Sequence, residues 1–200
     1  TIVTDNLVLR HGYAVNPVQP LSDGAAYFSG DGSDINIPTI TLNDATAWTI
    51  AYWAYCNANN DMTIGEADDT DNRFYHQPIT DNRVRIHTDS VNGNLTHSAG
   101  LVSLNQWNHY AITCDGSNTL KLYINGIYQS TAEFADTKFV IDNIGNPYTE
   151  TGYALDGYMC NVGVWSATLD QAQIKSIMWK KYSQLTSSET TSLVSWWNLS

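Results

Sequence analysis

The chain has 200 residues, which is enough for one domain with its own hydrophobic core. It is 42% hydrophobic and only 14% charged, which argues against a disordered chain, and no apolar run approaches the ~20 residues of a spanning helix, so membrane insertion is not expected. Twenty acidic against nine basic side chains give a net charge of −11, which argues against nucleic acid as a partner.

Short alternating segments separated by Gly, Asn and Asp recur along the chain and predict β-strands. We expect residues 1–24 to form an N-terminal strand or arm. Further strands are expected at SDINIPTITL, AWTIAYWAYC, RVRIHTDS, WNHYAITCD, TLKLYINGIYQST, KFVIDNIG and DGYMCNVGVW. Their regular spacing predicts an all-β fold, a two-sheet antiparallel β-sandwich.

Turn residues between these segments predict where hairpins close. Asn125-Gly126 supplies the two positive-φ residues of a type I′ turn, and Asn92-Gly93 is expected to close another hairpin. The stretch from Asn57 to Asn82 is polar and acidic, so we expect long loops there with at most one brief strand. Because loops on a rigid scaffold often carry binding sites, this stretch and residues 147–153 are the predicted recognition surface.

One short C-terminal helix is expected at residues 169–182, with Asp170 capping its start and Gln173 in the reciprocal position. Residues 183–200 are expected to form a linker followed by LVSWWNLS. That last segment is either the final strand of this domain, with Trp196 and Trp197 packed on the sandwich, or the start of a second unit.

The three cysteines, Cys56, Cys114 and Cys160, each lie in an apolar strand-like segment and are expected to be buried thiols. An odd number of unpaired cysteines favours assembly in a reducing compartment. No signal peptide is expected in this chain, because it starts at Thr1 without a charged segment followed by an apolar one.

Four segments in order resemble laminin G-like domains of the concanavalin A-like lectin/glucanase superfamily. They are AAYFSGDGSDINIP, AWTIAYWAY, WNHYAITCDGSNTLKLYINGIYQS and DGYMCNVGVWSATLDQAQI. The resemblance implies a concanavalin A-like jelly roll over residues 25–182. The family's acidic pair in the last segment is replaced here by Cys160 and Asn161. Tandem arrays of such modules, with openings like DNLVLR, are similar to structural proteins of marine bacteriophages.

Glycoside hydrolysis needs two carboxylates flanking the scissile bond, and the laminarinase-type enzymes of this superfamily supply them from a single strand as E-x-D-x-x-E. Glu66, Glu133, Glu150 and Glu189 are scattered, and Asp142 in VIDNIG lacks both flanking glutamates. The five histidines show no metal-ligand spacing. The sequence therefore predicts that this domain is not an enzyme.

The resemblance implies a structural Ca²⁺ site, since family members often hold calcium between the early turn and the aspartate that opens the late D-G-x strand. The matching residues here are Asp31, Asp34 and Asp156. Such sites combine carboxylate oxygens with backbone carbonyls of tight turns. The alternative is that Asp31-Gly32 and Asp156-Gly157 are only turn residues.

Sugar binding needs an exposed aromatic face beside polar groups that bond hydroxyls. The candidates in expected loops are Tyr75, His76, Tyr148 and Tyr153. The tryptophans in expected strands are assigned to the core; they are Trp48, Trp53, Trp107 and Trp165.

These features predict a non-catalytic carbohydrate-binding or adhesion module at an extracellular surface. Its expected partners are a glycan or a surface protein, together with neighbouring chains of a larger assembly. The alternative is a structural or decoration protein of a bacteriophage virion, packed in an oligomer.

Overall fold

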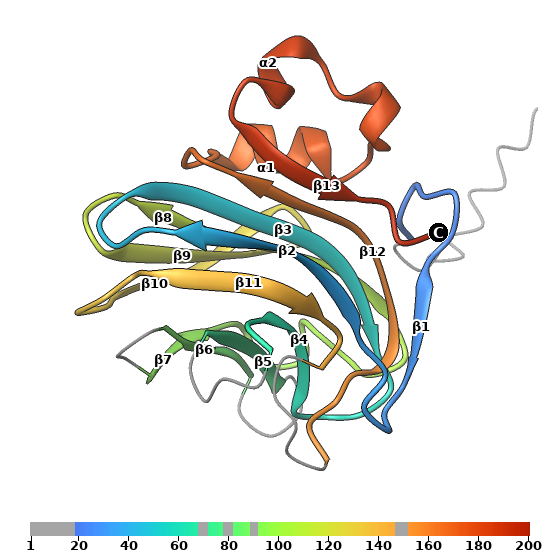
Figure 1. Cartoon of the computed structure of the whole chain (residues 1–200). Helices are drawn as coiled ribbons and strands as arrows, with labels where there is room; N and C mark the ends of the chain where they lie inside the picture. The colour runs from blue at the N-terminus through green and yellow to red at the C-terminus, as the bar shows by residue number, and fades with distance from the viewer. Residues whose placement is uncertain (1–18, 68–71, 78–81, 89–91, 147–151) are drawn as a thin grey trace, which may run out of the picture.

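A computed structural model describes residues 19–67, 72–77, 82–88, 92–146 and 152–200 of the chain. Figure 1 shows two sheets packed face to face, with the helical segments on the outside of one of them. All strand pairs within the sheets are antiparallel. The predicted all-β, two-sheet antiparallel sandwich is therefore confirmed.

Within the described residues, the larger sheet has seven strands. In spatial order they are β1 (Ala26–Ser29), β12 (Asp156–Trp165), β3 (Ala47–Cys56), β8 (Trp107–Asp115), β9 (Thr119–Ile124) and β10 (Ile127–Glu133), with β13 (Leu193–Trp197) also paired to β12. The turn between β9 and β10 has φ of 51° at Asn125 and 74° at Gly126, which confirms the predicted hairpin.

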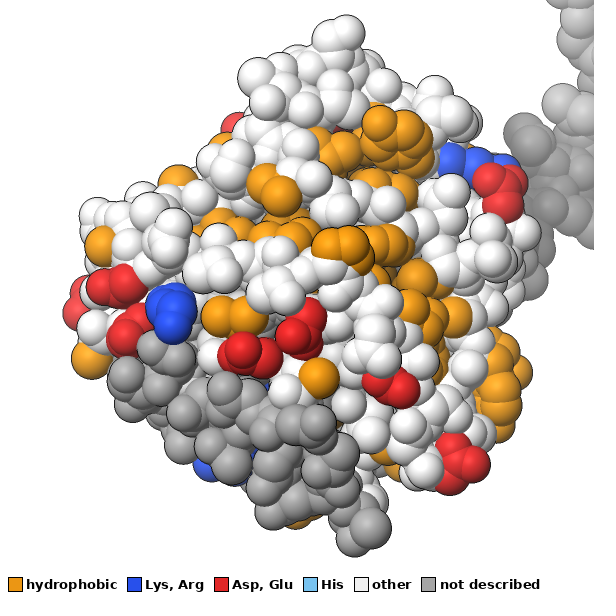
Figure 2. All heavy atoms as spheres, viewed as in Figure 1, with side chains coloured by type: hydrophobic (Ala, Val, Ile, Leu, Met, Phe, Trp, Pro, Cys, Tyr) orange, Lys and Arg blue, Asp and Glu red, His pale blue; other side chains and the backbone are white. Residues whose placement is uncertain are grey.

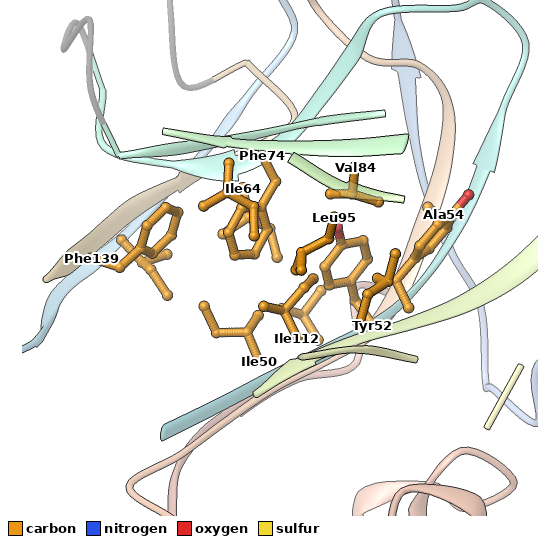
Figure 3. Close-up of a cluster of buried hydrophobic side chains, with 14 of the residues drawn as sticks. Ile50, Tyr52, Ala54, Ile64, Phe74, Val84, Leu95, Ile112 and Phe139 are labelled. Carbon is orange, nitrogen blue, oxygen red and sulfur yellow. The ribbon is translucent and has the colours of Figure 1, made fainter. Parts of the chain in front are cut away.

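The smaller sheet has six strands in the part of the chain that the structure describes. In spatial order they are β2 (Ile35–Leu42), β11 (Phe139–Ile144), β4 (Asp61–Gly65), β5 (Arg73–Gln77), β6 (Arg83–His87) and β7 (Asn92–Thr96). Figure 3 shows Phe74, Val84 and Leu95 of this sheet pointing toward Ile50 and Ile112 of the larger one. Burial of these alternating side chains between the sheets drives the sandwich together.

The helical segments follow β12. The first, α1 (Gln171–Ile177), is capped at its N-terminus by Asp170, whose carboxylate accepts a hydrogen bond from the Gln173 N–H at 2.8 Å. It is shorter than the predicted 169–182, and the Met178 carbonyl beyond its end accepts from the Trp53 indole at 2.9 Å. A 3₁₀ turn, η1 (Tyr182–Gln184), and an unexpected short helix, α2 (Ser187–Thr190), complete the segment.

Two local predictions are wrong. The stretch from Asn57 to Asn82 contains two strands, β4 and β5. Met62 and Ile64 are buried in the core and hold β4 in the sheet, but the acidic residues around them give the segment the composition of a loop. The pair Asn92-Gly93 lies at the start of β7, not in the turn. Gly93 is needed for packing there, since a Cβ on it would overlap the ring of Phe134.

The C-terminal strand β13 lies within the larger sheet, where Trp196 is opposite Gly163 of β12. The division of the chain into residues 1–24, 25–182 and 183–200 stays a prediction. The three cysteines are buried free thiols, as expected. In the described part of the chain, no helix has the length and apolar character needed to cross a membrane.

Candidate functional site

At one end of the sandwich, loops bring together segments that are distant in sequence. Ser29 of β1 is paired with Asp156 of β12, and the Gly30 N–H donates to the Leu155 carbonyl at 3.0 Å. The Asn57 N–H donates to the Asp156 carbonyl at 2.7 Å. We call this region the loop end and define it as residues 30–34, 57–61, 143–146 and 152–156.

The predicted calcium ligand Asp31 lies on the exposed turn of the loop end. Its carboxylate accepts hydrogen bonds from the hydroxyls of Ser29 and Ser33, the latter at 2.9 Å. These bonds favour the charged form and hold the pKa of Asp31 below its usual value. The carboxylate is therefore held in place as an anion near neutral pH.

The other two predicted ligands also lie at the loop end. Asp34 accepts from the Asn143 side-chain amide at 2.5 Å, and Asp156 accepts from the Asn57 side-chain amide at 2.9 Å. Gly30 approaches Asp156 so closely that a Cβ on it would lie 3.0 Å from the Asp156 Cβ. The structure thus brings Asp31, Asp34 and Asp156 to one region, each with neutral hydrogen-bond donors.

The loop end supplies carboxylate and amide oxygens, which are the types of ligand that a hard cation such as Ca²⁺ prefers. The Asn146 Oδ1 atom, near Gly32, is buried and accepts no hydrogen bond in the described structure. Among the described residues, however, no three His, Cys, Asp or Glu side chains are grouped so as to hold a metal ion. The calcium site stays a prediction.

A buried carboxylate at the loop end, Asp61, was not predicted from the sequence. Its side chain is 2% exposed; it accepts from the Cys56 thiol and from the N–H groups of Asp156 and Ala58. Its Oδ2 atom has no hydrogen-bond partner in the described structure. Burial, with a smaller contribution from the charge of Asp156, raises the pKa of Asp61 to about 7. The alternation in DMTIG was the signal that could have identified this strand.

The residues predicted for sugar binding are only partly described. Tyr75 and His76 belong to strand β5, not to a loop, and are paired with Met62 and Asp61. On the other side of β4, the half-buried Tyr153 accepts the Met62 N–H with its carbonyl at 2.8 Å. The backbones of three of the four predicted sugar-binding residues, Tyr75, His76 and Tyr153, therefore lie next to β4. The side chains of Tyr75 and His76, and all of Tyr148, lie outside the described structure.

A row of aromatic side chains crosses the outer face of the larger sheet beside the loop end. Its members stand opposite one another on neighbouring strands, in the order Tyr27 (β1), Tyr158 (β12), Tyr55 (β3) and Trp107 (β8). Successive ring centroids are 5.1, 5.8 and 5.7 Å apart. We call these four residues the aromatic row.

The aromatic row faces solvent. Tyr27 is 57% and Tyr158 38% exposed, whereas their sequence neighbours Phe28 and Met159 are in the core. Figure 2 shows hydrophobic side chains reaching the surface beside β1, at the right of the view. Of the four strand tryptophans assigned to the core, Trp48, Trp53 and Trp165 are fully buried but Trp107 is only half-buried. The sequence signal for this row was the alternation along each strand, which places these aromatic residues at outward-facing positions between buried ones.

A family model described as the concanavalin A-like lectin/glucanases superfamily matches residues 29–175 of the chain. That range contains most of both sheets and α1, together with every residue of the loop end. A search of curated proteins gives no match.

Several solved structures have the same fold. A candidate carbohydrate-binding protein from Bacteroides ovatus has a TM-score of 0.64 at 17% identity, over 87% of this chain and 50% of its own. Domain 4 of the extracellular arabinanase AbnA from Geobacillus stearothermophilus, in complex with arabinotriose, has a TM-score of 0.60 at 17% identity over 77% and 76%. The CBM40 module of a Ruminococcus gnavus sialidase, bound to sialyllactose, has a TM-score of 0.51 at 15% identity over 74% and 99%. The chain thus spans half of the first of these proteins.

Proposed function

The chain belongs to the concanavalin A-like lectin/glucanase superfamily, and from this premise we propose that it is a non-catalytic carbohydrate-binding module that recognises surface glycans. Its site of action would be an extracellular surface. A glycan, or a glycan carried on a surface protein, is the proposed partner.

The observation that carries this proposal is the aromatic row. A sugar ring presents a face of C–H groups that packs well on an aromatic ring, while its hydroxyls need polar partners. The row spans four strands, or about 14 Å at ~4.8 Å between neighbours, so an oligosaccharide can contact several of its rings. The polar loop end at its border supplies amide and carboxylate groups for the hydroxyls.

The solved structures support the proposal at the level of fold. The arabinanase domain was solved with arabinotriose and the CBM40 module with sialyllactose, so this sandwich supports sugar binding in other proteins. Neither identity exceeds 17%, so the sugar bound by this chain follows from neither. The comparisons give no support to the alternative of a bacteriophage virion protein.

We further propose that the loop end binds a structural Ca²⁺. Asp31, Asp34 and Asp156 would supply carboxylate oxygens, and the ion would fix the turn that follows β1 against the start of β12. A bound ion would also supply positive charge near Asp61. In this role calcium stabilises the loops that flank the aromatic row.

The direct test is glycan binding by wild type and by two tyrosine variants. Tyr158→Ala removes a central ring of the row, and Tyr128→Ala removes a 46% exposed tyrosine on β10 of the same sheet. We expect a glycan array and calorimetry to show that Tyr158→Ala weakens binding at least tenfold while Tyr128→Ala does not. Equal affinities for all three proteins would refute the aromatic row as the site.

A further inference from the structure

The residues next to the aromatic row are covered, although they face the same side of the larger sheet. Side chains two residues apart in a strand point to one face, so each member of the row has a neighbour about 7 Å away along the chain. We call these neighbours the second line; they are Ala25, Cys160, Trp53 and His109. The three that lie in strands are at most 3% exposed, whereas Tyr27 and Tyr158 of the row face solvent.

The cover over the second line comes from the end of the helical segment. Helix α1 packs on the outer face of the larger sheet (Figure 1). Met178, directly after α1, packs with Trp53 and Cys160, and its carbonyl accepts a hydrogen bond from the Trp53 indole at 2.9 Å. Trp107 of the aromatic row packs against the same cluster. The helical segment therefore forms a step that rises from the sheet directly beside the aromatic row.

Trp179 is an exposed aromatic residue of this step. Its ring centroid lies 5.5 Å from that of Trp53, yet 47% of its side chain is exposed. Two residues later, Lys181 forms an ion pair with Asp23, which precedes β1 and so holds this part of the helical segment against the sheet. The aromatic row and Trp179 therefore form one apolar surface with two parts. The row is its floor, and Trp179 is its side wall.

The rings of the floor do not lie in one plane. In the order of the row, the angles between neighbouring ring planes are 46°, 83° and 65°. A sugar packs its C–H groups on the face of an aromatic ring, so the flat surface of a crystalline polysaccharide needs several rings in one plane. A single glycan chain can rotate about its glycosidic bonds and follow rings of different tilt. The tilted rings therefore favour a single chain.

We propose that Trp179 determines the specificity of the glycan site, as a side wall that contacts a single soluble glycan chain and excludes the surface of a crystalline polysaccharide. The proposal rests on the proposed function and names its ligand class. A single chain that lies along the row has Trp179 at its side. The neighbouring chains of a crystal would extend over the second line, a space that Met178 and Trp179 already occupy.

The test compares soluble and crystalline forms of the same sugar, so that only the shape of the ligand differs. The probes are cellohexaose beside microcrystalline cellulose, chitohexaose beside crystalline chitin, and the oligosaccharide that binds most tightly on a glycan array. The variants are Trp179→Ala, Trp179→Phe and the control Tyr182→Ala, which removes a 54% exposed ring from η1 of the same helical segment. Thermal unfolding shows which variants fold, and Trp179→Phe carries the comparison if Trp179→Ala does not.

We expect wild type to bind at least one soluble oligosaccharide and to adsorb to neither crystalline polysaccharide. Trp179→Ala should weaken binding of the soluble ligand at least fivefold, Trp179→Phe should show a smaller loss, and Tyr182→Ala should bind as wild type does. Adsorption of wild type to a crystal, or equal affinities of the Trp179 variants and Tyr182→Ala, would overturn this proposal and leave the proposed function standing. Binding of no glycan in any panel would overturn both.

Discussion

Replacing Asp61 with asparagine should reveal the free energy stored in a buried carboxylate at the loop end. The folded protein holds this group at a pKa of about 7, against an ordinary value of 3.8, because burial penalises the charged form. Between these two values the folded state binds more protons than the unfolded state. Stability therefore falls as the pH rises from 3.8 through 7 and stays low above it.

The magnitude follows from the difference of about three pH units, at about 1.4 kcal/mol per unit, which gives about 4 kcal/mol. Between pH 4.5 and pH 8 the wild type should lose about 3 kcal/mol of unfolding free energy through this one group. The amide of the substituted asparagine cannot ionise, so the variant avoids the loss. Relative to wild type, Asp61→Asn should gain about 3 kcal/mol on going from pH 4.5 to pH 8.

Urea denaturation in EGTA at the two pH values measures this difference, because EGTA removes any cation that would hold Asp61 charged. The matched control is Asp44→Asn. Hydrogen bonds from Thr137 lower the pKa of Asp44 below 3.8, so this carboxyl is largely ionised in both the folded and the unfolded state at pH 4.5 and at pH 8. The stability difference between that variant and wild type should therefore be nearly the same at the two pH values. If the difference in unfolding free energy between Asp61→Asn and wild type were the same at both pH values, the reasoning would be refuted.

Three further predictions test other parts of the molecule. Burial opposes the charge of Glu189, but its hydrogen bonds, led by the one from Lys180 at 2.6 Å, lower its pKa to about 2. The unfolding free energy that the charged Glu189 contributes is therefore fully present above pH 4.5 and is lost as the pH falls through 2. Glu189→Gln should therefore cost about 2–3 kcal/mol in urea unfolding at pH 7, and an equal cost at pH 2 would contradict this. Gly126→Ala should lower the unfolding free energy by about 1–3 kcal/mol, because φ at this position is +74° and a Cβ would lie 2.9 Å from the Met178 sulfur. Thermal unfolding measures this loss, and an unchanged midpoint would show that the turn relaxes to accept the side chain. EGTA should lower the thermal midpoint of wild type but not of Asp156→Asn, which lacks one of the proposed calcium ligands. Calcium at 100 times its Kd stabilises the folded state by about 2.7 kcal/mol, and this is the free energy that EGTA removes. An unchanged midpoint of wild type would refute the calcium proposal.

The fold could be predicted from the sequence because its main signals are local. Alternation in AWTIAYWAYC places Trp48, Ile50 and Tyr52 in the core, and Asn125-Gly126 needs only its own backbone preferences to form a turn. Asn92-Gly93 has the same composition but a different role. Its glycine makes room for Phe134, a residue far along the chain, and such a contact leaves no local pattern.

The candidate site was less predictable because it depends on register between distant strands. The aromatic row needs Tyr27, Tyr55, Trp107 and Tyr158 to stand opposite one another, and no single segment shows that they do. Asp61 was hidden for a related reason, since a carboxylate among acidic residues has the composition of a loop. Only the pairing of β4 with its neighbours buries it.

The most direct test of the account is the binding of wild-type protein to an array of neutral and acidic glycans, followed by titration of Tyr158→Ala with the best ligand. The account predicts saturable binding to at least one glycan, with no release of reducing ends, and a loss of at least tenfold in the variant. Absence of binding across the array, or hydrolysis of a bound glycan, would contradict a non-catalytic carbohydrate-binding module.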